Sequence, residues 1–292
     1  MSTARIHDQG YRRYEGERIG VSGAMVSLGL HATQRVLGLK RRFRTKVLPA
    51  IILLVSYTPA VVLVGMSAFL SDLDVAQDFI PYEEYYDIIA LAILLFVAFV
   101  APEALCTDRR SGMLSLYLSS PLTRDTYLLA KAAAVFGVLL AVTLGPPLLL
   151  LLAYTLADAG PDSVAEFFEL LVQILAAGLF VSLLPTSISV GISSFTARRA
   201  FASAGIAISL IATNILSSVL TAEEGRQLGA GYGMLNLFWL PFEGAYRIFG
   251  ERSEAPGLGD LATGWVFAAN VAWAAAFAGF ARFQYQKVSV DR

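Results

Sequence analysis

The stretch VLPAIILLVSYTPAVVLVGMSAFL, residues 47–70, carries no charged side chain. A helix needs about 20 apolar residues to cross the hydrocarbon of a bilayer, so this stretch predicts a transmembrane helix. The composition of the whole chain agrees, because 56% of its residues are hydrophobic and only 15% are charged, whereas a soluble domain carries about 25% charged residues. Membrane-spanning strands are excluded, because they alternate apolar and polar residues and this stretch is apolar on all faces.

Similar runs follow along the chain, and together they predict an all-α integral membrane protein with six transmembrane helices. The approximate bounds of the later runs are 86–102, 127–157, 170–195, 200–222 and 261–281. Lys131 is the only Lys, Arg, Asp or Glu inside them once the second run is counted from Ile88. The third helix is long enough either to protrude from the bilayer or to bend at Pro146 and Pro147, and Pro185 predicts an interruption of the fourth.

The charges of the connecting segments sort by sign, and this sorting predicts the orientation. Apart from Lys131, Lys and Arg lie in the N-terminal segment, in the connections after the second and fourth helices, and at the C-terminus, with Arg226, Arg247 and Arg252 as exceptions. Because Lys and Arg mark the cytoplasmic side, both termini are predicted to be cytoplasmic. The outer connections hold most of the acidic residues, including Asp72, Asp74, Asp78, Glu83 and Glu84.

Three segments are predicted to lie outside the six helices of the transmembrane domain, residues 47–292. Residues 1–24 are polar and predict a disordered cytoplasmic tail. Residues 25–46 predict an amphipathic helix along the cytoplasmic interface, with an apolar stripe in lipid formed by Leu28, Ala32, Val36, Leu39 and Phe43. Residues 232–250 predict either a re-entrant segment or a surface loop on the outer side before the sixth helix, where Glu243 and Arg247 are spaced to pair.

The connection between the second and third helices is unusual for a simple linker. It reads EALCTDRRSGMLSLYLSSPLTRDTYLLAK from Glu103 to Lys131, with a charged start and a break at Gly112. Residues 113–118 predict a short apolar helix, which Ser-Ser-Pro ends, and Thr123 is placed to cap the third helix. A short apolar helix in the cytosol needs a partner surface, which is either another protein or this protein's own helices.

This connection resembles the corresponding loop of ABC-2-type transporter permeases, which are the membrane subunits of type V ABC exporters. The shared features are an acidic residue after the second helix, an Arg and Gly turn, a short leucine-containing helix, a Ser-Pro step and a Lys in the next helix. The six-helix layout, the amphipathic helix and the outer segment also match. The loop features fall on Glu103, Arg109 or Arg110, Gly112, Leu114, Leu116, Leu118, Ser120, Pro121 and Lys131.

The resemblance implies a subunit that carries a substrate across a bacterial or archaeal inner membrane, most simply as an exporter. It implies that residues from Glu103 to Arg124 couple to a separate ATP-binding cassette ATPase, with Arg198 and Arg199 in the second cytoplasmic turn beside them. It also implies a second permease copy or a paralogue, which completes a dimer. Because this chain has no Gly-rich loop ending in Gly-Lys-Ser/Thr, ATP and Mg are expected on the partner. No catalytic residue, metal site or nucleic-acid partner is expected here.

Two other functions stay open, an intramembrane aspartyl hydrolase and a scaffold without transport. The hydrolase needs two Asp residues together in the bilayer, and Asp87 and Asp260 are the candidates, although both fall at outer helix ends where acids favour the helix dipole. A serine hydrolase is excluded, because both histidines precede the first span. The lack of charge at mid-membrane depth argues against an ion-coupled carrier and favours an apolar or amphipathic cargo.

Overall fold

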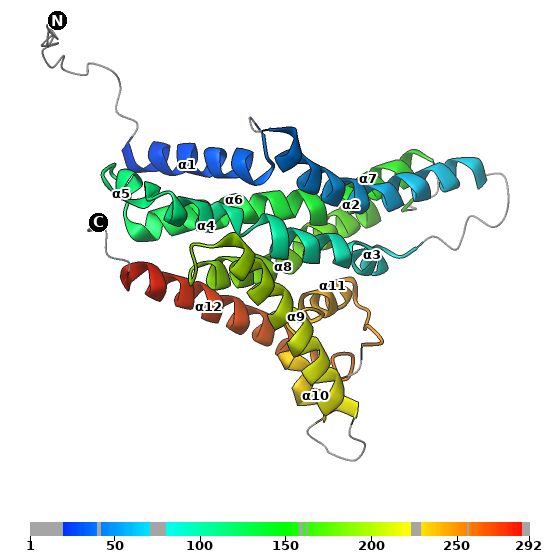
Figure 1. Cartoon of the computed structure of the whole chain (residues 1–292). Coiled ribbons are helices and arrows are strands. Elements are labelled where there is room, and N and C mark those ends of the chain that lie inside the picture. Colours follow the sequence, from blue (N-terminus) through cyan, green and yellow to red (C-terminus); the bar gives the residue numbers. More distant parts are fainter. Residues whose placement is uncertain are drawn as a thin grey trace, which may run out of the picture.

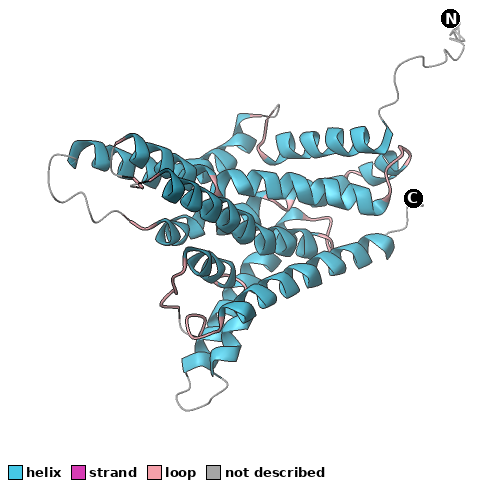
Figure 2. Cartoon of the chain, turned by 180° about the vertical axis from the view of Figure 1, so that it is seen from behind, coloured by secondary structure: helices cyan, strands magenta, loops and turns pink. Residues whose placement is uncertain are grey.

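Helices make up all the regular structure of this protein in the part of the chain that can be described. The computed structural model describes residues 20–39, 42–70, 80–157, 160–161, 163–222, 229–255 and 257–287. No strand occurs in these ranges (Figure 2). Most of the predicted N-terminal tail, residues 1–19, lies outside them, as does Arg226.

The helices follow one another along the chain in the order labelled in Figure 1. They are α1 (Gly20–Val36), α2 (Phe43–Leu70), α3 (Tyr82–Leu95), the π-helix η1 (Phe96–Val100), α4 (Glu103–Arg110), α5 (Met113–Leu118), α6 (Arg124–Thr143), α7 (Gly145–Leu156), α8 (Val164–Ser193), α9 (Arg199–Ala222), α10 (Gly229–Tyr232), the 3-10 helix η2 (Gly233–Leu235), α11 (Leu240–Phe249) and α12 (Thr263–Lys287).

Six helical segments are long and apolar enough to cross a membrane, which confirms the predicted number of spans. They run over Phe43–Ser67, Tyr82–Arg110, Arg124–Leu156, Val164–Ser193, Arg199–Thr221 and Thr263–Lys287. Their bounds differ from the predicted ones by a few residues at most ends, because polar residues extend the helices beyond the apolar runs. The exception is the second span, which continues well beyond its predicted end.

The second span passes through Pro102 instead of ending there. A proline lacks the N–H that a helix uses and clashes with the carbonyl four residues earlier. The π-helix η1 precedes it, and its wider turn is closed by the Ala101 N–H, which donates to the Phe96 carbonyl at 2.9 Å. Residues 103–110 were predicted to begin the connection, but they form α4, the end of the span.

The other prolines behave in two ways. The third span breaks at Leu144, between α6 and α7, next to Pro146 and Pro147, as predicted. The fourth span contradicts the prediction, because α8 runs without interruption through Pro185. Membrane helices tolerate proline where neighbouring helices re-satisfy the freed backbone groups, and Pro185 is buried among such neighbours.

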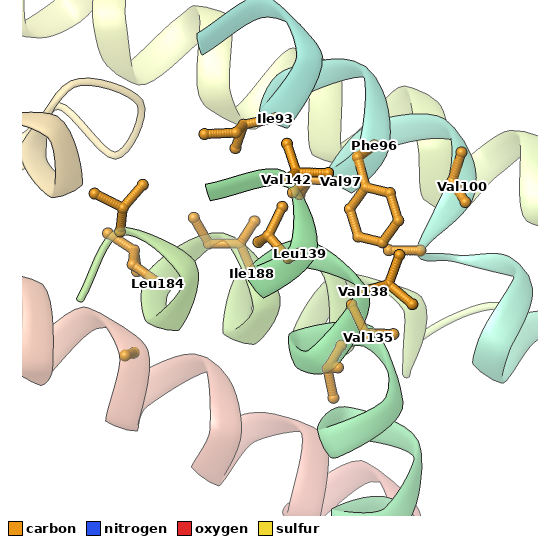
Figure 3. Close-up of a cluster of buried hydrophobic side chains, with 14 of the residues drawn as sticks. Ile93, Phe96, Val97, Val100, Val135, Val138, Leu139, Val142, Leu184 and Ile188 are labelled. Atoms are coloured by element: carbon orange, nitrogen blue, oxygen red, sulfur yellow. The ribbon is translucent and has the colours of Figure 1, made fainter. Parts of the chain in front are cut away.

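The core lies where α3 with η1, α6 and α8 meet (Figure 3). The three helices contribute branched aliphatic side chains, and Phe96 is the aromatic residue among those labelled in Figure 3. Figure 3 labels residues from all three: Ile93 of α3 with Phe96, Val97 and Val100 of η1, then Val135, Val138, Leu139 and Val142 of α6, and Leu184 and Ile188 of α8. This packing fixes the second, third and fourth spans relative to one another.

Three of the five residues of the predicted stripe before the first span pack on protein, whereas Leu39 and Phe43 are exposed. Leu28, Ala32 and Val36 are buried, and α1 lies lengthwise beside α6 (Figure 1). The predicted helix was therefore right in its periodicity but wrong in its bounds, and α6 rather than lipid covers the part of the stripe that lies on α1. A turn at Gly38 (φ 69°) separates α1 from α2, and a Cβ there would meet the Thr45 carbonyl at 2.5 Å.

The segment before the sixth span forms a helix, α11, that packs against α3, α8 and α12. The predicted Glu243–Arg247 pair exists, with Arg247 Nε 2.5 Å from Glu243 Oε1 and both side chains almost fully buried. Arg247 also donates to the carbonyls of Gly259 at 2.9 Å and Leu261 at 3.0 Å. Arg247, held by Glu243 within α11, thus ties this helix to the chain that leads into α12.

Opposite charges gather at the two ends of the bundle. The start of α1, α5 and the last turn of α12 lie at one end (Figure 1). A cavity of about 880 Å³ lies at the other end, next to α11, and the acidic residues among its lining are Glu83, Glu84, Asp87, Glu243, Glu251 and Glu254. The arginines described below lie at the α5 end, so the structure separates charge as the connecting segments predict.

Candidate coupling site

The short helix α5 presents an exposed apolar ridge at one end of the bundle. Gly112 precedes it with φ 68°, a left-handed conformation that glycine adopts without steric cost. Leu114 is buried at 7% exposure and anchors the helix, whereas Leu116 is 62% exposed and Met113 is also exposed. The helix covers the predicted residues 113–118, and only one of its sides packs on this protein.

The chain after α5 is held firmly where the third span begins. Thr123 caps α6 through a capping box with Thr126, as its position predicted. The adjacent Arg124 donates from Nη1 to the Gln286 carbonyl of α12 at 2.5 Å. Ser120 and Pro121 stay exposed, so the step between α5 and α6 is accessible while its far end is tied to the sixth span.

The turn between α8 and α9 lies against α4, as the sequence predicted. Arg109 of α4 donates to the Ser194 carbonyl, and Arg199 forms an ion pair with Glu103 at 2.8 Å. Arg199 also donates from Nε to the Phe99 carbonyl of the π-helix at 3.1 Å. The Arg199 guanidinium is thus bound by α4 and η1 of this chain.

Four arginines surround a cavity of about 1230 Å³ beside α4 and the start of α9. None of its described lining residues is a carboxylate. Arg110 and Arg198 are exposed, and no ion pair of either is found among the described residues. The remaining lining is Phe99, Arg109, Arg199 and small residues of α9. We call this feature the arginine cavity; with the α5 ridge it offers an apolar and a cationic surface at the same end of the bundle.

Asp108 is the functional residue that sequence reasoning missed. Its side chain is 0% exposed, and Lys131, 1% exposed, lies with Nζ 2.6 Å from Asp108 Oδ2. Arg35 of α1 forms an ion pair with the other carboxylate oxygen, and the Tyr127 hydroxyl donates to Oδ2 at 2.9 Å. We call Arg35, Asp108, Lys131 and Tyr127 the Asp108 cluster. A lysine inside a span requires a counterion, and that requirement was the signal for Asp108.

The residues of the hydrolase alternative do not form a buried pair. Asp87 and Asp260 are both exposed. The Asp87 carboxylate accepts a hydrogen bond from the Tyr246 hydroxyl at 2.7 Å, and burial raises the pKa of Tyr246, so the phenol remains a donor. Two carboxylates need shared burial to divide the roles of acid and base, and these two lack it.

Comparison with known families finds a match over most of the chain. A family model described as ABC-2 family transporter protein matches residues 35–290. The match includes all six spans, the Asp108 cluster and the arginine cavity. Comparison with individual curated proteins gives no match. The chain is thus a multi-pass membrane protein that belongs to the ABC-2 transporter family.

Proposed function

We propose that this chain is the membrane-spanning subunit of an ABC exporter, and that α5 and the arginine cavity receive the motion of a separate ATPase. The observation that carries the proposal is the α5 ridge. Leu116 is 62% exposed on a helix whose other side is anchored by Leu114. A ridge of this kind, at the same end of the bundle as the exposed Arg110 and Arg198, fits a partner with an apolar groove and an acidic rim.

The remaining parts of the proposal follow from family membership and charge. The α5 end carries the arginines and is cytoplasmic by the positive-inside rule, which puts the ATPase, with its ATP and Mg, on that side. A second copy or a paralogue completes the membrane dimer, in a bacterial or archaeal inner membrane. The spans bury no unpaired acid or base at mid-depth among the described residues, so an apolar or amphipathic cargo is favoured.

Co-purification with the ATPase tests the docking surface. Leu116→Asp places a charge on the ridge and removes burial of a leucine side chain, worth about 1.5–3 kcal/mol, so affinity for the ATPase should fall at least about tenfold. Leu156→Asp is the matched control, because Leu156 is also exposed but lies at the end of α7. Wild-type binding by Leu116→Asp, or equal loss in both variants, would sink the docking proposal.

The direction and the cargo class need a transport assay. Inverted membrane vesicles that hold the permease and its ATPase should accumulate apolar or amphipathic compounds only when ATP is supplied. ATPase activity should rise with the same compounds. Stimulation by hydrophilic compounds alone would contradict the cargo class, and ATP-driven loss from loaded inverted vesicles would contradict export.

A further inference from the structure

The Asp108 cluster carries more positive than negative charge. Arg35 and Lys131 each contribute a cation, and both approach the single carboxylate of Asp108. The Tyr127 hydroxyl also donates to that carboxylate, so acceptors are scarce. Burial of an uncompensated charge is costly, and a surplus cation at this depth favours a bound anion.

The Arg35 guanidinium shows the same shortage of acceptors. Its Nη1 donates to Asp108, whereas its Nε is buried without an acceptor in the part of the chain that the structure describes. Lys131 Nζ lies 5.6 Å from the ring centroids of both Tyr117 and Tyr127. Aromatic faces attract a cation but do not neutralise it.

A cavity of about 400 Å³ opens beside these cations, between α1, α5 and α6. Each of its polar side chains can donate a hydrogen bond, and none of its described lining residues is a carboxylate; these polar residues are His31, Gln34, Arg35, Tyr117 and Lys131. Burial raises the pKa of Tyr117, so its hydroxyl is a donor at neutral pH. We propose that this cavity binds the phosphate group of an anionic phospholipid.

The surroundings of the cavity favour a lipid over free phosphate. Leu39 lines it and is exposed. Leu30 on α1 and Phe43 and Val47 at the start of α2 are exposed as well, and α2 is where the first span begins. A cavity at a span's end, cationic inside and apolar at its rim, matches a headgroup with acyl chains beside it. The inference does not depend on ATPase docking.

Gln34→Glu tests the proposal without removing any member of the Asp108 cluster. The substitution adds a carboxylate of the same size to the cavity lining, which supplies the missing acceptor and repels a phosphate. In delipidated protein, affinity for phosphatidylglycerol measured by native mass spectrometry should fall at least about tenfold. The melting temperature without lipid should stay the same or rise, which separates lost binding from lost folding.

Gln286→Glu is the matched control, because Gln286 is exposed on α12 and does not line the cavity. It should bind phosphatidylglycerol as the wild type does, and phosphatidylcholine should bind both proteins weakly. Undiminished binding by Gln34→Glu, or equal loss in the control, overturns the proposal. Inorganic phosphate is added as a competitor for bound phosphatidylglycerol. If it displaces the lipid as effectively as added phosphatidylglycerol does, the phosphate that this cavity binds is not that of a lipid, and this part of the proposal is overturned.

Discussion

Asp108→Asn is the substitution that probes the Asp108 cluster most directly. It keeps the size of the side chain and its hydrogen bond with Tyr127, but removes the negative charge that pairs with both Arg35 and Lys131, the only one found beside them among the described residues. The carboxylate is 0% exposed, with Lys131 Nζ at 2.6 Å, so water does not screen the loss. Removing one partner of a buried ion pair costs about 3–5 kcal/mol.

The expected change in melting temperature follows from that free energy. At about 2–4 °C per kcal/mol for a domain of about 150–250 residues, Asp108→Asn should melt ~6–20 °C below the wild type. Asp125→Asn is the control. It removes the same charge from an ion pair with Arg282 in which the two side chains are 53% and 60% exposed, and such pairs contribute about 0–1 kcal/mol.

The assay is thermal unfolding of both variants and the wild type, purified in one detergent at one lipid concentration. Equal losses for Asp108→Asn and Asp125→Asn would refute the reasoning, because burial would then make no difference. A double variant adds a second check. Asp108→Asn with Lys131→Gln removes one surplus cation, so it should recover part of the loss, and simple additivity of the two single variants would count against direct coupling.

Three further substitutions each test one structural feature by thermal unfolding. Gly112→Ala should cost about 1–2 kcal/mol, because φ is 68° there, whereas Gly112→Asn should lie close to the wild type. Arg247→Met leaves Glu243 buried without its partner, so a loss of about 3–5 kcal/mol is expected, together with faster proteolysis near residue 253. Gly145→Ala would place a Cβ 1.7 Å from the Tyr57 hydroxyl; the expected loss of about 1–3 kcal/mol should shrink in a Tyr57→Leu background.

Periodicity and local chemistry predicted those parts of the fold that depend on neighbouring residues alone. Uncharged runs fixed the number of spans, because the bilayer sets a minimum apolar length. The limits of α5 followed from Gly112 and from the Ser-Ser-Pro step, and the cap at Thr123 from its place before an apolar run. The pair of Glu243 and Arg247 followed from helical spacing alone.

Features that depend on tertiary contacts were not predictable in the same way. The apolar stripe of α1 has the same sequence pattern whether lipid or α6 covers it, because both surfaces are apolar. Arg199 has the sequence context of a solvent-exposed cation, and only the fold brings Glu103 to it. Asp108 was hidden because Pro102 predicts a helix end, which assigned residues 103–110 to a connection. The π-helix η1 accommodates Pro102 within the span, so α4 continues the helix beyond it. Asp108 of α4 therefore lies next to Lys131.

The contacts around α4 determine how a force on α5 is transmitted. Only Ser111 and Gly112 separate α5 from α4, which ends the second span. Asp108 links α4 to α1 and α6, and the contacts of Glu103 and Arg109 link it to the α8–α9 turn. A push on α5 therefore acts on spans two to five together. Within spans two and three the helical hydrogen-bond ladder is irregular further along, at the π-helix and at Leu144. If α5 receives the motion of an ATPase, as proposed above, spans two and three are therefore the ones expected to bend, whereas α8 runs without interruption.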